Sequence, residues 1–226
     1  MTKIGIIVAM NKELALMIPL LSNPVEKNIN GLVFYEGTVG NKDVVILKCG
    51  IGKVNAAIGT VTMIDHFSPN IIINSGVAGG SDQNVNVMDV VVGESVAYHD
   101  VWCGPEIAVG AIQGLPLYYK GDQATISLIP KADNIKFGLI TSGDQFIDTL
   151  EKVQAIKKDF PESLAVDMES GAIAQVCELR KTPFVSIRVI SDSPGASHNN
   201  TEQYYDFWED APKHTFEITH QLIQEL

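Results

Sequence analysis

Short apolar runs rich in Val and Ile recur along the chain and are separated by helix-length segments. The runs predict strands at 3–9, 32–38, 43–49, 70–75, 89–98, 136–141, 164–167 and 183–190. The segments between them predict helices at 11–22, 53–67, 145–158, 168–180 and 208–225. Near-continuous runs such as 70–73 and 184–187 indicate strands buried on both faces. The predicted fold class is therefore α/β, with a mixed, mostly parallel twisted sheet flanked by helices in three layers.

The connections refine this picture. Gly40 and Asn41 have hairpin chemistry, so strands 32–38 and 43–49 are predicted to be antiparallel. The Gly- and Pro-containing stretches 100–120 and 192–203 are predicted loops, and loops longer than about 12 residues are often lids or binding loops. No repeat or linker interrupts the 226 residues. We predict one domain spanning 1–226.

Charge and cysteine usage narrow the function classes. The 16 basic and 27 acidic residues give a net charge of −11, which should repel nucleic-acid backbones but not a free nucleoside. Cys49, Cys103 and Cys177 are far apart and show neither a disulfide framework nor metal-ligand spacing. Polar residues at 11–13 cut the first apolar run too short for a signal peptide, and no run reaches the roughly 20 residues of a membrane span. We predict a cytoplasmic protein with no metal and no nucleic-acid or membrane partner.

Three acidic side chains fall where predicted strands end. Asp192 closes the run 187–192 and follows Arg188 by four residues. Glu169 comes directly after the strand at 164–167, and Glu13 follows the first strand. Ligands of open α/β sheets bind outside the carboxyl ends of the strands. The pattern predicts acid–base chemistry on a polar small molecule.

Each of these features also has a structural interpretation. Asp192 could be a helix cap or a surface acid, although charge beside a buried strand needs a partner. Glu13 and Glu169 could be first-turn acids favoured by the helix dipole. Segment 50–54 could be a phosphate loop or a tight turn, and it lacks the spacing of the nucleotide fingerprints. The Gly-rich turn predicted at 76–80 would let a ligand approach the backbone.

Aromatic and histidine residues give further candidates. His99 and Asp100 could form a proton relay, but no activated nucleophile is near them in the sequence, so His99 is interpreted as structural. Phe146, predicted at the start of a helix, could be a core residue or could stack on a flat ligand. A cluster before the last helix could anchor that helix, Trp208 above all. Its members are Tyr204, Tyr205, Phe207 and Trp208.

Seven motifs, in order and at family spacing, resemble the 5′-methylthioadenosine/S-adenosylhomocysteine nucleosidases of the purine and uridine phosphorylase superfamily. They are Gly5–Met10 with Glu13, Gly50–Val54, Asn74–Gly80, Tyr98–Asp100, Ser142–Ile147, Val166–Glu169 and Arg188–Asp192. The resemblance runs from Lys3 to the last helix. It implies a nucleoside phosphorylase-like fold and cofactor-free hydrolysis of the bond between adenine and a 5′-thioribose. The implied pathway is methionine salvage and S-adenosylmethionine recycling, a branch of amino-acid biosynthesis.

The resemblance also implies roles for the site residues. Asp192 would be the general acid that protonates purine N7, and Glu13 would activate the attacking water, with Arg188 helping to hold it. Glu169 would accept hydrogen bonds from the ribose hydroxyls. The remaining implied contacts are Met168 along the ribose, Phe146 on adenine, the Ile147 backbone at the base edge, and Val77, Ala78 and Gly79 beside the substrate. Met10, Ile51 and an aromatic residue of the 204–207 cluster, most simply Tyr204, would surround the alkylthio group.

Two departures from the family pattern create further expectations. Many relatives carry a hydroxyl residue in place of Val77, and this hydroxyl contacts the catalytic aspartate. Asp192 is therefore expected to find another partner or to become more basic. The loop 101–118 has an unusual sequence, but Pro116 is expected to keep the family's role of closing the 5′ pocket of the neighbouring subunit in a homodimer.

The main alternative is a phosphate-dependent nucleoside phosphorylase on the same fold. Phosphate recognition favours Arg, and the chain has only Arg180 and Arg188. Lys12 and Lys53 could substitute, but Lys12 is expected to point elsewhere on its helix and Lys53 to face solvent. A non-catalytic nucleoside-binding protein would have no reason to carry all three acids, and a dinucleotide-dependent dehydrogenase would need the missing fingerprint. Water is the favoured nucleophile.

Overall fold

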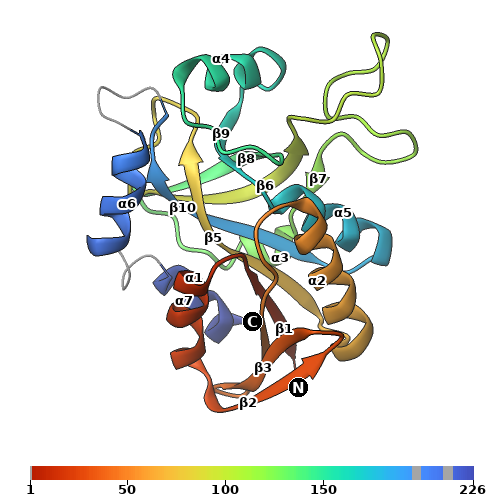
Figure 1. The fold of residues 1–226 in the computed structure, drawn as a ribbon. Helices are drawn as coiled ribbons and strands as arrows, with labels where there is room; N and C mark the ends of the chain where they lie inside the picture. Colours follow the sequence, from red (N-terminus) through yellow and green to blue (C-terminus); the bar gives the residue numbers. More distant parts are fainter. Residues whose placement is uncertain (1, 195–199, 211–215) are drawn as a thin grey trace.

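The computed structural model describes residues 2–194, 200–210 and 216–226. Their strands form one ten-stranded mixed sheet flanked by helices, which confirms the α/β fold class (Figure 1). The strands are β1 (Lys3–Val8), β2 (Ser22–Ile29), β3 (Leu32–Val39), β4 (Lys42–Lys48), β5 (Ile71–Gly80), β6 (Val90–Tyr98), β7 (Tyr119–Lys120), β8 (Ile135–Ser142), β9 (Ser163–Asp167) and β10 (Phe184–Asp192). The helices are α1 (Asn11–Met17), the 3₁₀ turn η1 (Ile18–Leu20), α2 (Lys53–Phe67), α3 (Gln123–Ile126), α4 (Leu150–Asp159), α5 (Ser170–Arg180), α6 (Asn200–Asp210) and α7 (Glu217–Glu225).

The sheet closes on itself at one end. Its order is β10-β6-β8-β9-β5-β1-β4-β3-β2, and β10 also pairs in parallel with β5. Strands β5, β10, β6, β8 and β9 therefore form a closed circuit, from which β1, β4, β3 and β2 extend (Figure 1). Within this circuit Gly79 of β5 lies opposite both Asp192 of β10 and Val166 of β9. The closure thus brings together the ends of three strands that are distant in sequence.

Both faces of the sheet are buried by helices, as the continuous apolar runs predict. In β1, Ile4 and Ile6 point into one core and Ile7 points into the other. Helices α1 and α7 cover the first core, and α2 packs against α5 over the second (Figure 1). A third cluster lies between α4 and the strands β6, β8 and β9. Among the described residues, no helix has the length and apolarity needed to cross a membrane.

Several predicted boundaries are confirmed and others are wrong. The hairpin is confirmed, since β3 and β4 pair antiparallel around Gly40 at φ 58°, a conformation that favours glycine. The predicted helix 11–22 is too long, because α1 ends at Met17 and β2 begins at Ser22. Strand β2 pairs only with β3 at the sheet edge and is mostly exposed and polar. Its sequence therefore carries no hydrophobic alternation.

The later helices also differ from the prediction. Helix α4 begins at Leu150 rather than 145, because the Thr149 hydroxyl caps it by accepting a hydrogen bond from the Lys152 amide. Phe146 therefore lies in a loop before the helix and not at its start. The predicted helix 208–225 falls on parts of α6 and α7, while 211–215 lie outside the described residues. Of the predicted loop 192–203, residues 195–199 lie outside them and 200–203 belong to α6.

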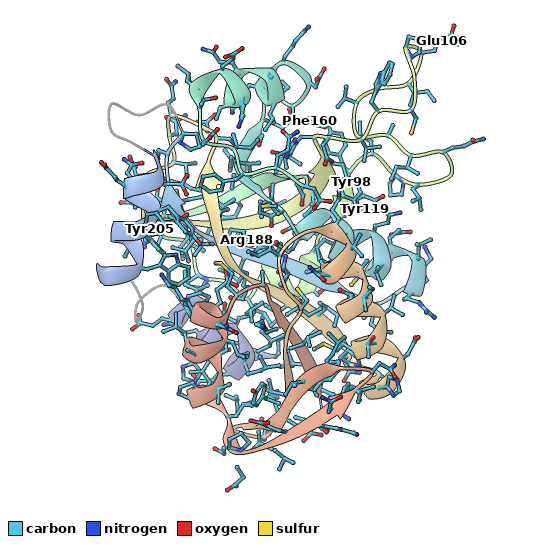
Figure 2. All side chains as sticks on the ribbon, viewed as in Figure 1. Tyr98, Glu106, Tyr119, Phe160, Arg188 and Tyr205 are labelled. Atoms are coloured by element: carbon cyan, nitrogen blue, oxygen red, sulfur yellow. The ribbon has the colours of Figure 1, made fainter. Side chains whose placement is uncertain are left out.

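The predicted long loop is confirmed at 101–118, which contains no helix or strand before β7. It projects from the body of the protein with Glu106 near its tip (Figure 2). Two of its apolar side chains are exposed, Trp102 by 68% and Ile107 by 41%. These side chains extend from the folded body instead of joining its core.

Candidate active site

A cavity of about 400 Å³ lies where β5, β9 and β10 end and α1 begins. This volume is in the range of small-molecule sites. Its lining contains twelve of the predicted site residues, namely Met10, Glu13, Ile51, Val77, Ala78, Gly79, Phe146, Ile147, Met168, Glu169, Asp192 and Tyr204. It also contains Tyr205, a second member of the aromatic cluster that was expected to line the site, and five residues that were not predicted, namely Ala9, Gln145, Val166, Asp167 and Ser191. Arg188 does not line the cavity but contacts two residues that do, Asp167 and Glu169. Pro116 is an exposed residue of the 101–118 loop.

Asp192 is held at the end of β10, with 1% of its surface exposed. The Ser191 hydroxyl donates a hydrogen bond of 2.6 Å to its Oδ1 atom. Gly79 faces the same carboxyl group, and a Cβ atom at that position would lie 3.3 Å from Oδ2. Ser191 thus supplies the other partner that the Val77 departure led us to expect. The position excludes the interpretation of Asp192 as a surface acid.

Glu13 lies in the first turn of α1, as its structural interpretation predicts, and it also lines the cavity. From the first turn of α1, its Oε2 atom accepts hydrogen bonds from the Ala9 and Met10 amides at 2.8 and 2.9 Å. Its Oε1 atom accepts a bond of 3.1 Å from the Val77 amide across the pocket. Burial raises the pKa of Glu13, although the charge of Arg188 and the three amides oppose this effect. A raised pKa brings a carboxylate closer to the basicity that proton abstraction from water requires.

Arg188 is almost completely buried at the centre of the molecule (Figure 2). Its Nη2 atom lies 2.6 Å from Asp167 Oδ2 and 3.8 Å from Glu169 Oε2. The same guanidinium donates to the Ser170 hydroxyl oxygen from Nε at 3.3 Å and from Nη2 at 3.2 Å. A buried guanidinium is tolerated only when it is paired and hydrogen-bonded. Asp167 is the partner that sequence reasoning missed, although its place in the motif with Glu169 was a signal.

Gly76 makes this approach of charges possible. Strand β5 continues through Gly80, so the turn predicted at 76–80 is wrong. A Cβ atom at Gly76 would lie 2.7 Å from Glu13 Oε1 and would overlap the Arg188 guanidinium. The glycine is therefore required where two site side chains cross the strand.

Glu169 stands at the N-terminal end of α5, but its side chain does not cap that helix. Its Oε1 atom instead accepts a hydrogen bond of 2.9 Å from the Gly52 amide of the 50–54 turn. Burial raises the pKa of Glu169 to about 7; Arg188 opposes this shift, and the neighbouring Asp167 adds to it. Gly50 and Gly52 have φ values of 98° and 93°, so the segment is the tight turn that leads into α2.

The opposite side of the cavity is aromatic and apolar. The rings of Phe146 and Tyr204 meet edge to face with centroids 5.9 Å apart, and the Tyr204 hydroxyl lies 3.3 Å from the Met10 sulfur. Tyr205 also lines the cavity, from α6 (Figure 2). In contrast, Phe207 is buried in the core, where Trp208 packs against it. The anchoring interpretation of Trp208 therefore fits its position.

The remaining cations that could bind phosphate are engaged elsewhere. Lys12 lies over the ring of Trp208, 5.2 Å from its centroid, so it points away from the site as expected. Lys53 does not face solvent as predicted, because it forms a partly buried ion pair with Asp100 at 2.8 Å. Arg180 pairs with Asp65 on the surface. Within the described ranges, no group of three or more His, Cys, Asp or Glu side chains is arranged to hold a metal ion.

Comparison with known proteins gives a consistent result. Residues 3–224 match the phosphorylase superfamily. The 5′-methylthioadenosine/S-adenosylhomocysteine nucleosidase of Desulfotalea psychrophila is 38% identical over 232 residues, covering 99% of this chain and 98% of the relative. The Neisseria meningitidis nucleosidase in complex with methylthio-immucillin-A is 34% identical with a TM-score of 0.94, and both chains are fully covered. A futalosine hydrolase mutant of Helicobacter pylori is 27% identical, with a TM-score of 0.92 and full coverage of both chains.

Proposed function

The chain belongs to the phosphorylase superfamily and, within it, to the 5′-methylthioadenosine/S-adenosylhomocysteine nucleosidases, and on this premise we propose its reaction and site roles. It hydrolyses the N-glycosidic bond of these two substrates to adenine and the 5′-thioribose, in methionine salvage and S-adenosylmethionine recycling. The observation that carries the assignment is the convergence of Glu13, Glu169 and Asp192 in one cavity. The whole chain, 1–226, acts as a single domain in this proposal.

The departure of adenine needs a proton on the base. Asp192 is the proposed general acid, because the Ser191 hydroxyl fixes it. It also lies beside Gly79 of β5, which has no side chain that would crowd the carboxyl group. Protonation at purine N7 makes adenine a neutral leaving group and leaves positive charge on the ribose. Phe146 would hold the base by stacking, since its ring lines the cavity.

The attack on the ribose needs an activated water. Glu13 is the proposed base, and Arg188 helps to hold the water near it; Gly76 is where both side chains approach the same strand. Glu169 would accept hydrogen bonds from the ribose hydroxyls while the Gly52 amide keeps its carboxylate in place. Two acidic groups on opposite sides of the scissile bond are the usual arrangement for glycosidic cleavage.

The charges around the site favour water over phosphate as the nucleophile. Glu13, Asp167 and Glu169 surround one guanidinium, so an incoming dianion would meet an excess of negative charge. Lys12 and Lys53, the two candidate substitutes, are held by Trp208 and Asp100. A phosphorylase would need several strong donors to hold a phosphate beside the anomeric carbon.

Cleavage of 5′-methylthioadenosine is expected to proceed at the same rate with and without phosphate and to release the free 5′-thioribose. Mass analysis of the sugar product provides the test. A sugar 1-phosphate formed only in phosphate buffer would assign the chain to the phosphorylases. The same assay with S-adenosylhomocysteine and futalosine ranks the 5′ substituents, and the apolar side formed by Met10, Ile51 and Tyr204 favours an alkylthio group.

Glu169 is expected to select for ribose hydroxyls. A buried group that is built to bond a hydroxyl penalises an analogue that lacks it, because the group is left unpaired. Wild-type protein should therefore discriminate against the 2′-deoxy substrate, and Glu169→Ala should lose most of this discrimination. The ratio of kcat/KM for the two substrates measures the effect. Equal ratios in both proteins would remove Glu169 from this role.

We further propose a cytoplasmic homodimer in which the 101–118 loop closes the partner's 5′ pocket. Trp102 and Ile107 expose apolar surface on this loop, and Pro116 of the same loop is also exposed. All three cysteines are free, which suits a reducing compartment. Light scattering should give twice the mass of the chain, and Trp102→Ser should weaken both the dimer and the activity. A fully active monomer would exclude this assembly.

A further inference from the structure

Outside the cavity, one partly buried cluster of charges joins two segments that line it to a third segment that does not. The segments are the 50–54 turn, the end of β6 and the loop 143–149. We propose that Lys53 and Asp100 are positioning residues, which hold the 50–54 turn and the base-binding loop in register and thereby set the selectivity of Glu169 for ribose hydroxyls. This inference rests on the nucleosidase function proposed above.

The contacts of the cluster are reciprocal. Lys53 Nζ donates to both carboxylate oxygens of Asp100, at 2.9 and 2.8 Å. Asp100 Oδ2 also accepts a bond of 2.9 Å from the Asp144 amide. Asp144 Oδ1 in turn accepts a bond of 2.8 Å from the Lys53 amide. Each of the three segments is therefore bonded to the other two.

None of the three charged side chains lines the cavity, but Ile51 and Gln145, which lie close to Lys53 and Asp144 in the sequence, do. Gly52, next to Lys53, donates its amide to Glu169, and Ile51 lines the 5′ side. Gln145 and Phe146, next to Asp144, line the base side. The cluster thus acts on the substrate through backbone placement, and a displaced turn would take from Glu169 the amide that orients it.

The chemistry of the cluster suits a fixed position rather than proton transfer. Lys53 and Asp100 are largely shielded, with 25% and 18% of their side chains exposed, and the ammonium lies 5.2 Å from the centroid of the Tyr98 ring. Burial raises the pKa of Asp100, but the bonds from Lys53 and the Asp144 amide outweigh it and hold this pKa below the ordinary value. His99, the neighbour of Asp100 in the possible proton relay, is partly buried against Gly143 and does not line the cavity.

The test compares Lys53→Met with the conservative Lys53→Arg and with Asp100→Asn. For Lys53→Met, KM for 5′-methylthioadenosine should rise about tenfold or more with a smaller change in kcat, because small misplacements of site groups are costly. The preference for substrate over its 2′-deoxy analogue should fall toward that of Glu169→Ala. Lys53→Arg should recover most of both properties. Asp100→Asn keeps the side-chain size and one acceptor oxygen, so it reports on the ion pair if Lys53→Met fails to fold.

Lys157→Met is the matched control. Lys157 forms an equally shielded ion pair with Asp82, at 2.6 Å and with 22% and 21% exposure, and neither residue lines the cavity. The Lys157→Met variant should have a lower melting temperature but an unchanged KM and an unchanged preference for ribose hydroxyls. Equal losses of stability in both variants, with KM and hydroxyl preference unchanged in Lys53→Met, would overturn the proposal. Calorimetry with 5′-methylthioadenosine is also run on Asp192→Asn and on the double variant Asp192→Asn/Lys53→Met. Binding is measured there without cleavage, so weaker binding by the double variant would support the positioning role even if the nucleosidase function failed.

Discussion

Asp192→Asn should lower kcat for 5′-methylthioadenosine by about 10²- to 10⁴-fold, the usual contribution of one general acid. Asparagine occupies the same space and still accepts the Ser191 hydroxyl bond through its carbonyl oxygen. It cannot deliver a carboxylic proton to the purine. Because the leaving base is then expelled without protonation, the loss falls on kcat, while the contacts to ribose and adenine remain.

The measurement is steady-state kinetics combined with a melting curve for each protein. Asp89→Asn provides a matched control, because Asp89 is also a buried aspartate beside a strand, and it accepts the Asn86 amide away from the cavity. The control should keep its kcat. If folded Asp192→Asn retains kcat near that of the wild type, the acid must be sought elsewhere in the cavity.

The sequence was sufficient to locate the acids because each of them stands beside a recognisable strand end. Strands β1, β9 and β10 carry buried apolar runs that predict their positions, and the carboxyl groups follow from the rule that sites lie beyond strand ends. The hairpin was also predictable, since Gly40 imposes its turn locally. The strand ends and the three acids could be located from one segment at a time, whereas most of the other lining residues were expected only from the family resemblance.

The missed features depend on contacts between distant segments. The ion pair of Arg188 with Asp167 and the bond from Gly52 to Glu169 arise only after the sheet has closed through β5 and β10. The second of these joins residues 117 positions apart. Likewise Gly76 resembles a turn glycine in sequence, whereas its function in the fold is to leave space for two side chains.

Strand β2 was missed for a different reason. Its residues are exposed at the sheet edge, so backbone pairing with β3 stabilises it without an apolar face. The pairing of Lys53 was also missed, because its partner Asp100 belongs to a distant segment that follows β6. A charged residue in a turn is usually solvated, and only the assembled fold shows that this one is paired.

Glu13→Gln should lower kcat by about 10²- to 10⁴-fold with little change in KM, because its proposed partner is water rather than the nucleoside. The amide oxygen of glutamine can still accept one set of the amides that hold Glu13, but the side chain cannot take a proton. Glu151→Gln is the control for helix-end effects, since Glu151 is an exposed acid in the first turn of α4. A variant with an altered KM and a normal kcat would contradict the assignment.

The pH profile distinguishes a base from a purely structural acid. Burial raises the pKa of Glu13, so its ionised form is populated only above that raised value. If Glu13 is the base, kcat must rise with pH through this pKa, and the acidic limb must lie above the range of an ordinary carboxyl group. The limb should persist in Glu169→Gln, which removes another carboxyl group with a raised pKa, and should vanish from the residual activity of Glu13→Gln. A limb that survives in Glu13→Gln would show that the water is activated by another group, and the three amides on Glu13 would then serve only to anchor α1.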